Sequence, residues 1–198
     1  GMRLVPDHYG RSPVSFLMIN DGRGRFSPRP LKTGNGQDLG MVTDAVWSDF
    51  DGDKDPDLLV AGDWEPLRFF RNNRGQLDEL PGILPHSEGW WNCIAAADLD
   101  GDGDDDFVLG NWGLNTRFKA SAERPMSLFL SDFDQNGRDE PILCQFNGEQ
   151  SYPLVQRADL VRQLPVLKKK YLKSDDYKNK TLADIFTPGQ ISGALKKD

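Results

Sequence analysis

The chain contains few of the residues on which disulfide frameworks and histidine chemistry depend. Its 198 residues include two cysteines and two histidines, and neither pair has the spacing of a zinc site or a disulfide scaffold. No apolar run approaches the 18 residues expected of a membrane span. A glycine-rich phosphate loop, a nucleophile elbow and a basic, aromatic nucleic-acid face are also missing. The sequence therefore does not predict a membrane span, a nucleotide-binding enzyme or a nucleic-acid partner.

The cysteines, Cys93 and Cys144, are expected to be two free buried thiols, because unpaired cysteine is among the most frequently buried residue types. A single disulfide between them is the alternative. The chain starts with Gly1 before Met2, which is not a natural start. We therefore expect the sequence to begin inside a longer chain, so that the lack of a signal peptide says nothing about location.

The acidic residues are concentrated in three short stretches. Hydrophobic residues make up 37% of the chain, and 20 glycines and 13 prolines favour short strands joined by many turns. Residues 49–57, 98–106 and 132–140 hold 15 of the 31 Asp and Glu but only two basic residues. Such crowding is repulsive at neutral pH unless something neutralises it. Three divalent cations would bring the formal net charge from −7 to −1.

Each acidic stretch belongs to a repeat, in which a strand-like run precedes the loop and another follows it. The copies cover residues 48–62, 97–110 and 131–144. Because apolar runs flank each loop directly, the pattern predicts three hairpins. A weaker repeat aligns residues 16–26 with 67–77, where an apolar strand meets an Asn/Gly turn. An acidic hairpin followed by an Asn-Gly hairpin makes a four-stranded unit of about 40–50 residues, the size of one β-propeller blade.

The last fifty residues have a different pattern. Leucine and valine recur near the helical period from Arg157 to Lys173, with Pro165 as a break or the start of a second helix. Thr181 and Thr187 are candidate N-caps of two short helices. The three lysines at 168–170 are interpreted as a solvated helix face. We expect propeller blades over residues 2–150 and a mainly helical insertion or appendage over 151–198.

Alternate residues of each acidic loop carry oxygen atoms, as calcium coordination requires. The first, third and fifth positions of the loops are Asp49, Asp51 and Asp53; Asp98, Asp100 and Asp102; and Asp132, Asp134 and Asn136. The seventh position would offer a backbone carbonyl, from Asp55, Asp104 and Arg138. The ninth position carries a candidate bidentate carboxylate, which is Asp57, Asp106 or Glu140. The sequence therefore predicts up to three Ca²⁺ ions that hold hairpins closed and take no part in chemistry.

An EF-hand also begins with alternating aspartates, but it needs Glu at position twelve and flanking helices. Position twelve is Val60, Leu109 or Leu143 here, each in a strand-like run. The EF-hand interpretation therefore fails for all three loops, and a dockerin loop fails because it also needs flanking helices.

The three loops and their flanking strands resemble the FG-GAP/VCBS repeat, the calcium-loop blade of integrin-α-type propellers. The resemblance covers most of residues 14–144. The motifs at 89–92, 110–115 and 152–153, with the lysine-rich helical segment, are similar to bacterial members of the UnbV/ASPIC and cartilage-acidic-protein group. The resemblance implies a secreted or surface-exposed propeller with the helical segment inserted between blades. A closed propeller needs at least four blades, so the resemblance also implies an incomplete ring here or further blades elsewhere.

Four tryptophans form a candidate platform for a sugar, although packing between blades is the alternative role for Trp64, Trp90, Trp91 and Trp112. His8 and His86 are isolated, and no catalytic residue is assigned. Asp63 and Glu65 could be read as a carboxylate pair for glycoside hydrolysis. The chain has so many acids that such pairs are expected by chance.

The sequence favours a non-catalytic, calcium-stabilised binding or adhesion module that lies outside the cytoplasm and binds a glycan or a protein. A polysaccharide-acting enzyme with a carboxylate site between blades is one alternative. A purely structural segment of a larger surface protein is another. Open blade edges would also allow a dimer.

Overall fold

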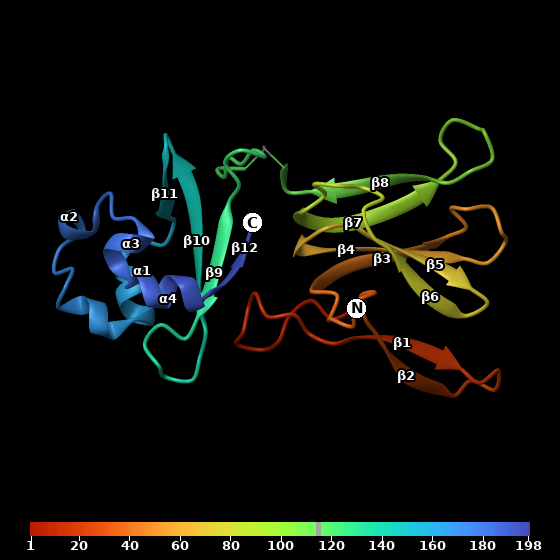
Figure 1. The fold of residues 1–198 in the computed structure, drawn as a ribbon, viewed down its shortest axis with the longest axis horizontal. Coiled ribbons are helices and arrows are strands. Elements are labelled where there is room, and N and C mark those ends of the chain that lie inside the picture. Colours follow the sequence, from red (N-terminus) through yellow and green to blue (C-terminus); the bar gives the residue numbers. More distant parts are fainter. Residues whose placement is uncertain (114–115) are drawn as a thin grey trace. The chain divides into compact units, whose positions relative to one another are not determined.

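The computed structural model describes residues 1–113 and 116–198 (Figure 1). Leu114 and Asn115, the last two residues of the motif at 110–115, lie outside this part. Antiparallel strands dominate, and short helices gather near the C-terminus. The predicted all-β class with a C-terminal helical part is confirmed.

The chain forms two compact units, which we describe separately. Unit 1 contains residues 1–5 and 11–113, and unit 2 contains residues 6–10 and the described residues from Thr116 onwards. The sequence placed a boundary at residue 150 because the last fifty residues have a different, mainly helical pattern. The division by compactness falls earlier, and the third acidic hairpin shares a unit with the helical segment.

Unit 1 consists of three layers of antiparallel strands (Figure 1). The first layer is the hairpin β1 (Ser15–Asn20) and β2 (Phe26–Leu31). The second is a four-stranded meander of β3 (Met41–Ser48), β4 (Asp57–Glu65), β5 (Arg68–Asn73) and β6 (Gln76–Leu80). The third is the hairpin β7 (Gly89–Ala97) and β8 (Asp106–Asn111), which pairs with β4 through only two residue pairs. The meander has the strand count and order predicted for one blade.

Strand β4 is buried along its whole length because it packs on both faces. Leu58 and Val60 face the cluster shared with β1 and β2, whereas Leu59 and Ala61 face the cluster shared with β7 and β8. Side chains alternate between the two faces of a strand, so a strand between two layers needs apolar residues at consecutive positions. The location of β4 between two layers thus explains the apolar run that follows the first acidic loop in the sequence.

A bulge in β3 connects the second and third layers. The register shifts between Val42 and Asp44, which leaves Thr43 as the extra residue. The Thr43 hydroxyl donates to the Trp91 carbonyl oxygen at 2.8 Å, and the Asp44 carboxylate accepts from the Ile94 amide at 2.9 Å. The bulge also turns Val46 to the face opposite Val42, where it packs against the third layer.

All five predicted hairpins are present. The three acidic loops connect β3 to β4, β7 to β8, and β9 (Ser127–Ser131) to β10 (Glu140–Asn147). The second repeat gives the β1–β2 and β5–β6 hairpins. In the β5–β6 turn, Arg74 and Gly75 both have positive φ, at 54° and 90°, as a two-residue primed turn requires.

The sheet of unit 2 has the strand order β11–β10–β9–β12. β11 (Gln150–Pro153) extends the third acidic hairpin, and β12 (Leu195–Lys197) returns from the C-terminus to pair with β9. Residues 151–198 therefore contribute two strands as well as helices.

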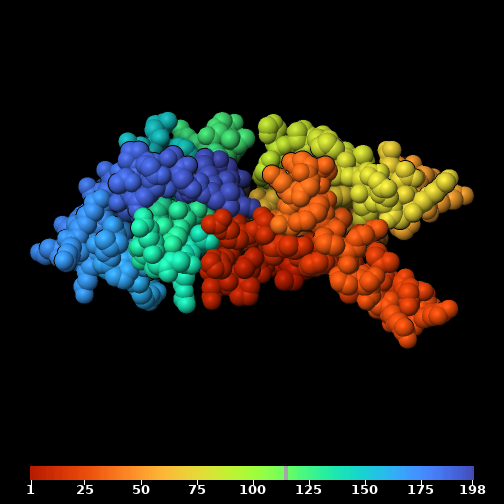
Figure 2. All heavy atoms as spheres, turned by 60° about the horizontal axis from the view of Figure 1, so that its bottom comes forward, coloured from red at the N-terminus to blue at the C-terminus, as the bar shows by residue number. Residues whose placement is uncertain are grey.

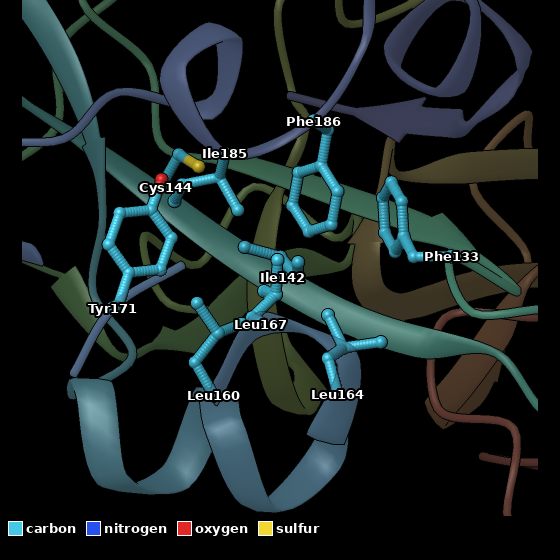
Figure 3. Packing of buried hydrophobic residues seen from close by; sticks show 9 residues of the cluster. All are labelled: Phe133, Ile142, Cys144, Leu160, Leu164, Leu167, Tyr171, Ile185 and Phe186. Carbon is cyan, nitrogen blue, oxygen red and sulfur yellow. The ribbon is translucent and has the colours of Figure 1, made fainter. Parts of the chain in front are cut away.

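The helices of unit 2 cover one face of this sheet. They are α1 (Arg157–Gln163), the 3₁₀ helix η2 (Pro165–Lys168), α2 (Ser174–Tyr177), α3 (Leu182–Ile185) and α4 (Pro188–Gly193). Figure 3 shows Leu160 and Leu164 below Ile142 of β10, with Ile185 and Phe186 above it. Phe133, from the third acidic loop, stacks on Phe186 with ring centroids 4.1 Å apart. The helical segment thus supplies half of the unit 2 core, which is why it shares a unit with the hairpin.

The predicted helix starts are confirmed. Pro165 begins η2, and Thr187 precedes α4, where its hydroxyl accepts from the Gln190 amide. Before α3, the Asp184 carboxylate accepts from both the amide and the hydroxyl of Thr181. These hydrogen bonds satisfy backbone donors that a helix start leaves free.

Both cysteines are free, but only Cys144 is buried, and the expectation that Cys93 is buried was wrong. Cys93 lies on the outward face of β7, where its sulfur occupies the space over Gly110. Desolvation raises the pKa of the Cys144 thiol to about 12.

The strands form open sheets, and no strand lies between Trp112 and Met126 among the described residues. Within the described ranges, no helix has the length and hydropathy needed to cross a membrane.

The helical segment should be a structural part of unit 2. Leu160 is fully buried under β10, so Leu160→Ala should lower the free energy of unfolding by about 2–5 kcal/mol, through lost contacts and a cavity. Val166→Ala, at a largely exposed position of η2, is the control and should change it by under about 0.5 kcal/mol. Urea unfolding measures both, and equal effects would show that the segment does not pack on the sheet.

Candidate metal centre

The three acidic loops close at the same register. The residue before each loop pairs with the ninth loop residue, and the pairs are Ser48 with Asp57, Ala97 with Asp106 and Ser131 with Glu140. The ninth carboxylate therefore begins the second strand of each hairpin, and the eight residues before it form the loop. The repeat seen in the sequence is thus a repeat in structure.

The backbone of the loops has the same conformation at two positions. The fourth residue has φ between 61° and 80° in Gly52, Gly101 and Gln135, and the sixth has φ between 75° and 98° in Lys54, Gly103 and Gly137. Such values suit glycine and are uncommon for other residues. Gln135 and Lys54 adopt them nonetheless, so each loop keeps this conformation even where the residue type does not favour it.

Three sets of hydrogen bonds recur across the loops. The first carboxylate accepts from the sixth amide, in pairs 49–54, 98–103 and 132–137, at 2.8–3.1 Å. The fifth side chain accepts from the seventh amide, in pairs 53–55, 102–104 and 136–138, at 2.8–3.0 Å. The ninth carboxylate accepts from the second amide, in pairs 57–50, 106–99 and 140–133. Backbone amides thus orient the side chains around the inside of each loop.

The loops bring three carboxylate groups together in each case, with ligand atoms within 4.8 Å of one another. The groups are Asp49, Asp51 and Asp53; Asp98, Asp100 and Asp106; and Asp132, Asp134 and Glu140. Asp57 and Asp102 lie outside these sets, although both have the loop hydrogen bonds described above. Nine of the eleven predicted acidic side-chain ligands thus converge directly, with Glu140 among them.

Several carboxylate oxygens in the loops are buried without a hydrogen-bond partner. They are Asp49 Oδ1 and Asp57 Oδ2 in the first loop and Asp134 Oδ1 in the third. An unpaired buried carboxylate oxygen costs considerable free energy. Desolvation raises the pKa of Asp57 and of Glu140, and neighbouring loop aspartates raise both further. A bound cation would supply the missing partner and favour the charged form.

The available donors decide which cations fit. The described clusters contain carboxylates, and the predicted additional donors are one amide side chain and backbone carbonyls. Hard, divalent cations prefer oxygen donors of this kind, whereas zinc and copper sites are usually rich in nitrogen and sulfur. The residues present therefore fit Ca²⁺, the ion that the sequence resemblance implies.

Two contacts from β5 support the first loop, and the sequence did not predict them. Arg71 Nε forms an ion pair with Asp51 Oδ2 at 2.8 Å, and the Asn72 amide donates to Asp57 Oδ1 at 2.7 Å. An ion in this loop would share Asp51 with Arg71. No local pattern could have signalled these residues, because only the meander brings β5 beside the loop.

Three of the four predicted tryptophans lie together. Trp64 and Trp112 both contact Trp90 edge to face, with ring centroids 5.0 and 5.3 Å away. Trp64 is 7% exposed and Trp112 is 51% exposed, so only the outer end of this row meets solvent. Trp91 is separate: its ring nitrogen donates to the Ser87 carbonyl oxygen, and its ring packs in the core beside Leu67.

The acidic pair on β4 is held by arginines. Asp63 pairs with Arg3 at 3.0 Å, and Glu65 pairs with Arg68 at 3.3 Å. The isolated His8 contacts Asp139 at 3.1 Å within unit 2. These contacts give the side chains structural roles.

Comparison with known proteins gave one family match. Residues 49–109 match the family model described as an FG-GAP-like repeat. A search of curated proteins and a search of solved structures each found no significant match. The matched segment contains the first two acidic loops and strands β4 to β7, with most of β8. The finer UnbV/ASPIC grouping stays a prediction, and the segment from Asp49 to Leu109 is similar to an FG-GAP-like repeat.

Proposed function

We propose that this chain is a calcium-stabilised, non-catalytic binding module of the β-propeller type that works outside the cytoplasm. The observation that carries the proposal is the repeated loop architecture. Three loops share one register, one backbone conformation and one hydrogen-bond pattern, and two of them retain buried carboxylate oxygens without partners. Solvated acidic turns would have no reason to bury such oxygens.

Calcium suits these loops better than magnesium does. Ca²⁺ takes six to eight oxygen ligands in flexible geometry, whereas Mg²⁺ demands a near-ideal octahedron and retains several waters. Each loop offers four side chains and one backbone carbonyl in nine residues. A loop so rich in protein oxygens fits the larger ion.

The ion's role in this proposal is mechanical. Each loop joins two strands whose other ends pack in a core, so an ion that holds the loop also fixes the start of the second strand. Calcium of extracellular fluid would saturate sites with affinities of about 10⁻⁴–10⁻³ M. Rigid hairpin loops would then present a fixed surface to a glycan or a protein.

A non-catalytic role is favoured over a glycoside hydrolase by the state of the β4 acids. A general acid and a nucleophile must be free to contact substrate. Asp63 and Glu65 are both largely buried and are paired with arginines.

Removing calcium should destabilise the protein. A site saturated at about 100 times its Kd contributes about 2.7 kcal/mol, which corresponds to a fall in Tm of about 5–10 °C per site. Thermal unfolding with excess Ca²⁺, with a chelator, and after adding back Ca²⁺ or Mg²⁺ measures this. We expect Ca²⁺ alone to restore the original Tm. If chelation has no effect and metal analysis finds an ion-free protein, the proposal is wrong.

One loop offers a matched pair of variants. Asp106→Asn removes the ninth-position carboxylate of the second loop and should reduce bound calcium from three ions towards two. Asp104→Asn makes the same charge change two residues earlier, where only the backbone carbonyl is a predicted ligand, and should keep all three. Equilibrium dialysis gives the stoichiometry. Equal losses would mean that the loop attracts calcium through charge alone.

A glycan partner would bind at the exposed end of the tryptophan row, because a sugar stacks on an accessible aromatic face. Trp112→Ala should weaken binding to a glycan panel at least tenfold. Trp47→Ala is the control, since Trp47 is also about half exposed but does not belong to the row. If both variants bind like the unmodified chain, a protein partner becomes the better candidate.

A further inference from the structure

The first layer of unit 1 has an apolar face that nothing in the described chain covers. Phe16, Met18 and Asn20 pair across the hairpin with Pro30, Pro28 and Phe26, so these six residues share one face. Met18 and Phe26 are 56% and 58% exposed. The opposite face, with Leu17 and Leu31, packs on the meander. The exposed residues therefore form a continuous sheet face, and Figure 2 shows the tip of this hairpin projecting from the rest of unit 1.

The third layer has an open face at the opposite side of unit 1. Cys93 pairs with Gly110 and Ala95 pairs with Val108, and this face carries the exposed cysteine and a valine that is 56% exposed. Ile94, Phe107 and Leu109 point the other way and pack on the meander. Unit 1 thus begins and ends with half-covered hairpins, whereas its middle layer is covered on both sides.

We infer that the chain associates head to tail with a second copy of itself, the β1–β2 face of one copy packing on the β7–β8 face of the next. The two faces complement each other in size. One presents Phe and Met side chains, and the other presents Cys, Ala and Gly with a single valine, so large side chains meet smaller ones as in a well-packed core. Within the chain, the two faces of the meander already pack on the inner faces of these two hairpins.

The charges beside the two faces are also complementary. The β1–β2 turn carries Arg23 and Arg25 against a single aspartate, and the β7–β8 loop carries six aspartates and no basic residue from Asp98 to Asp106. Figure 1 shows both loops at the same end of unit 1. Stacking the faces with the strands in the same direction would bring the arginines of one copy beside the acidic loop of the next. With the strands in the same direction, pairing two β7–β8 faces would oppose two acidic loops, and pairing two β1–β2 faces would oppose two arginine-bearing turns, so like charges disfavour a symmetric dimer of this kind.

Native Cys93 allows a direct test by cross-linking. It is the only exposed thiol of the two, because Cys144 is buried. Burial also raises the pKa of the Cys144 thiol to about 12, which disfavours the reactive thiolate. Met18→Cys adds a thiol to the other open face. The two positions lie in the outer layers and point away from each other, and sheets pack about 10 Å apart, so a short linker cannot join them within one chain.

Treating the Met18→Cys variant with a short bis-maleimide should give a ladder of oligomers. Peptide mapping of these oligomers should show links between positions 18 and 93. Adding Cys93→Ser should abolish those links. Leu172→Cys, at an exposed position in unit 2, is the control and should give at least fivefold fewer links to Cys93. The inference would be overturned if links of position 18 with 18, or of 93 with 93, formed in the same yield as links of 18 with 93. It would also be overturned if the 18–93 links were no more frequent than the links of the control variant to Cys93.

A mixing experiment distinguishes this arrangement from a symmetric one. Met18→Asp with Phe26→Asp blocks one face, and Val108→Glu blocks the other. By light scattering in excess Ca²⁺, the average mass of the unmodified chain should rise with concentration, while each variant alone stays at one copy. An equimolar mixture should reach two copies and stop. A mixture that stays monomeric, or an unmodified chain that is monomeric at millimolar concentration, would refute head-to-tail stacking. Neither result bears on calcium binding, which is measured separately.

Discussion

The constraint on which the fold depends is the burial of a carboxylate at the start of the second strand of the first and third acidic hairpins. Asp57 is fully buried and Glu140 nearly so, and burial raises the pKa of both. A strand cannot begin there unless backbone amides donate hydrogen bonds to the charged carboxylate, and the second loop residue supplies one such amide. The loop's positive-φ positions follow from this requirement, because the chain must curl tightly to bring amides and carboxylates to the same centre.

A second constraint is that a hairpin has two faces and a stable layer needs both covered. The meander of unit 1 satisfies it, with alternate residues of β4 packed on each side. The third acidic hairpin satisfies it differently, because the helical segment covers one face of its sheet with Leu160, Leu164 and Ile185. The same loop motif is therefore compatible with two kinds of neighbour. The hairpin supplies the metal loop, and the surrounding elements supply the core.

The sequence predicted what depends on neighbours along the chain. Hairpins, loop positions and helix caps are local, so spacing alone located the acidic loops and the capping residues Thr181 and Thr187. The missed features depend on residues that are distant in sequence. The Thr43 bulge, the ion pair of Arg71 with Asp51 and the separation of Trp91 from the other tryptophans all require knowing how layers meet. The exposure of Cys93 was missed for the same reason, since a strand pattern does not reveal which face another layer covers.

Calcium binding and self-association are compatible because the second acidic loop has more charge than one ion can neutralise. The six aspartates from Asp98 to Asp106 would retain a formal charge of −4 around a single divalent cation. The occupied loop would be held in one conformation and would still attract the arginines of a neighbouring β1–β2 turn. Salt would weaken that attraction without removing the apolar contact of the two faces. The ion thus fixes the shape of the loop, and the surplus charge orients the copy that stacks beside it.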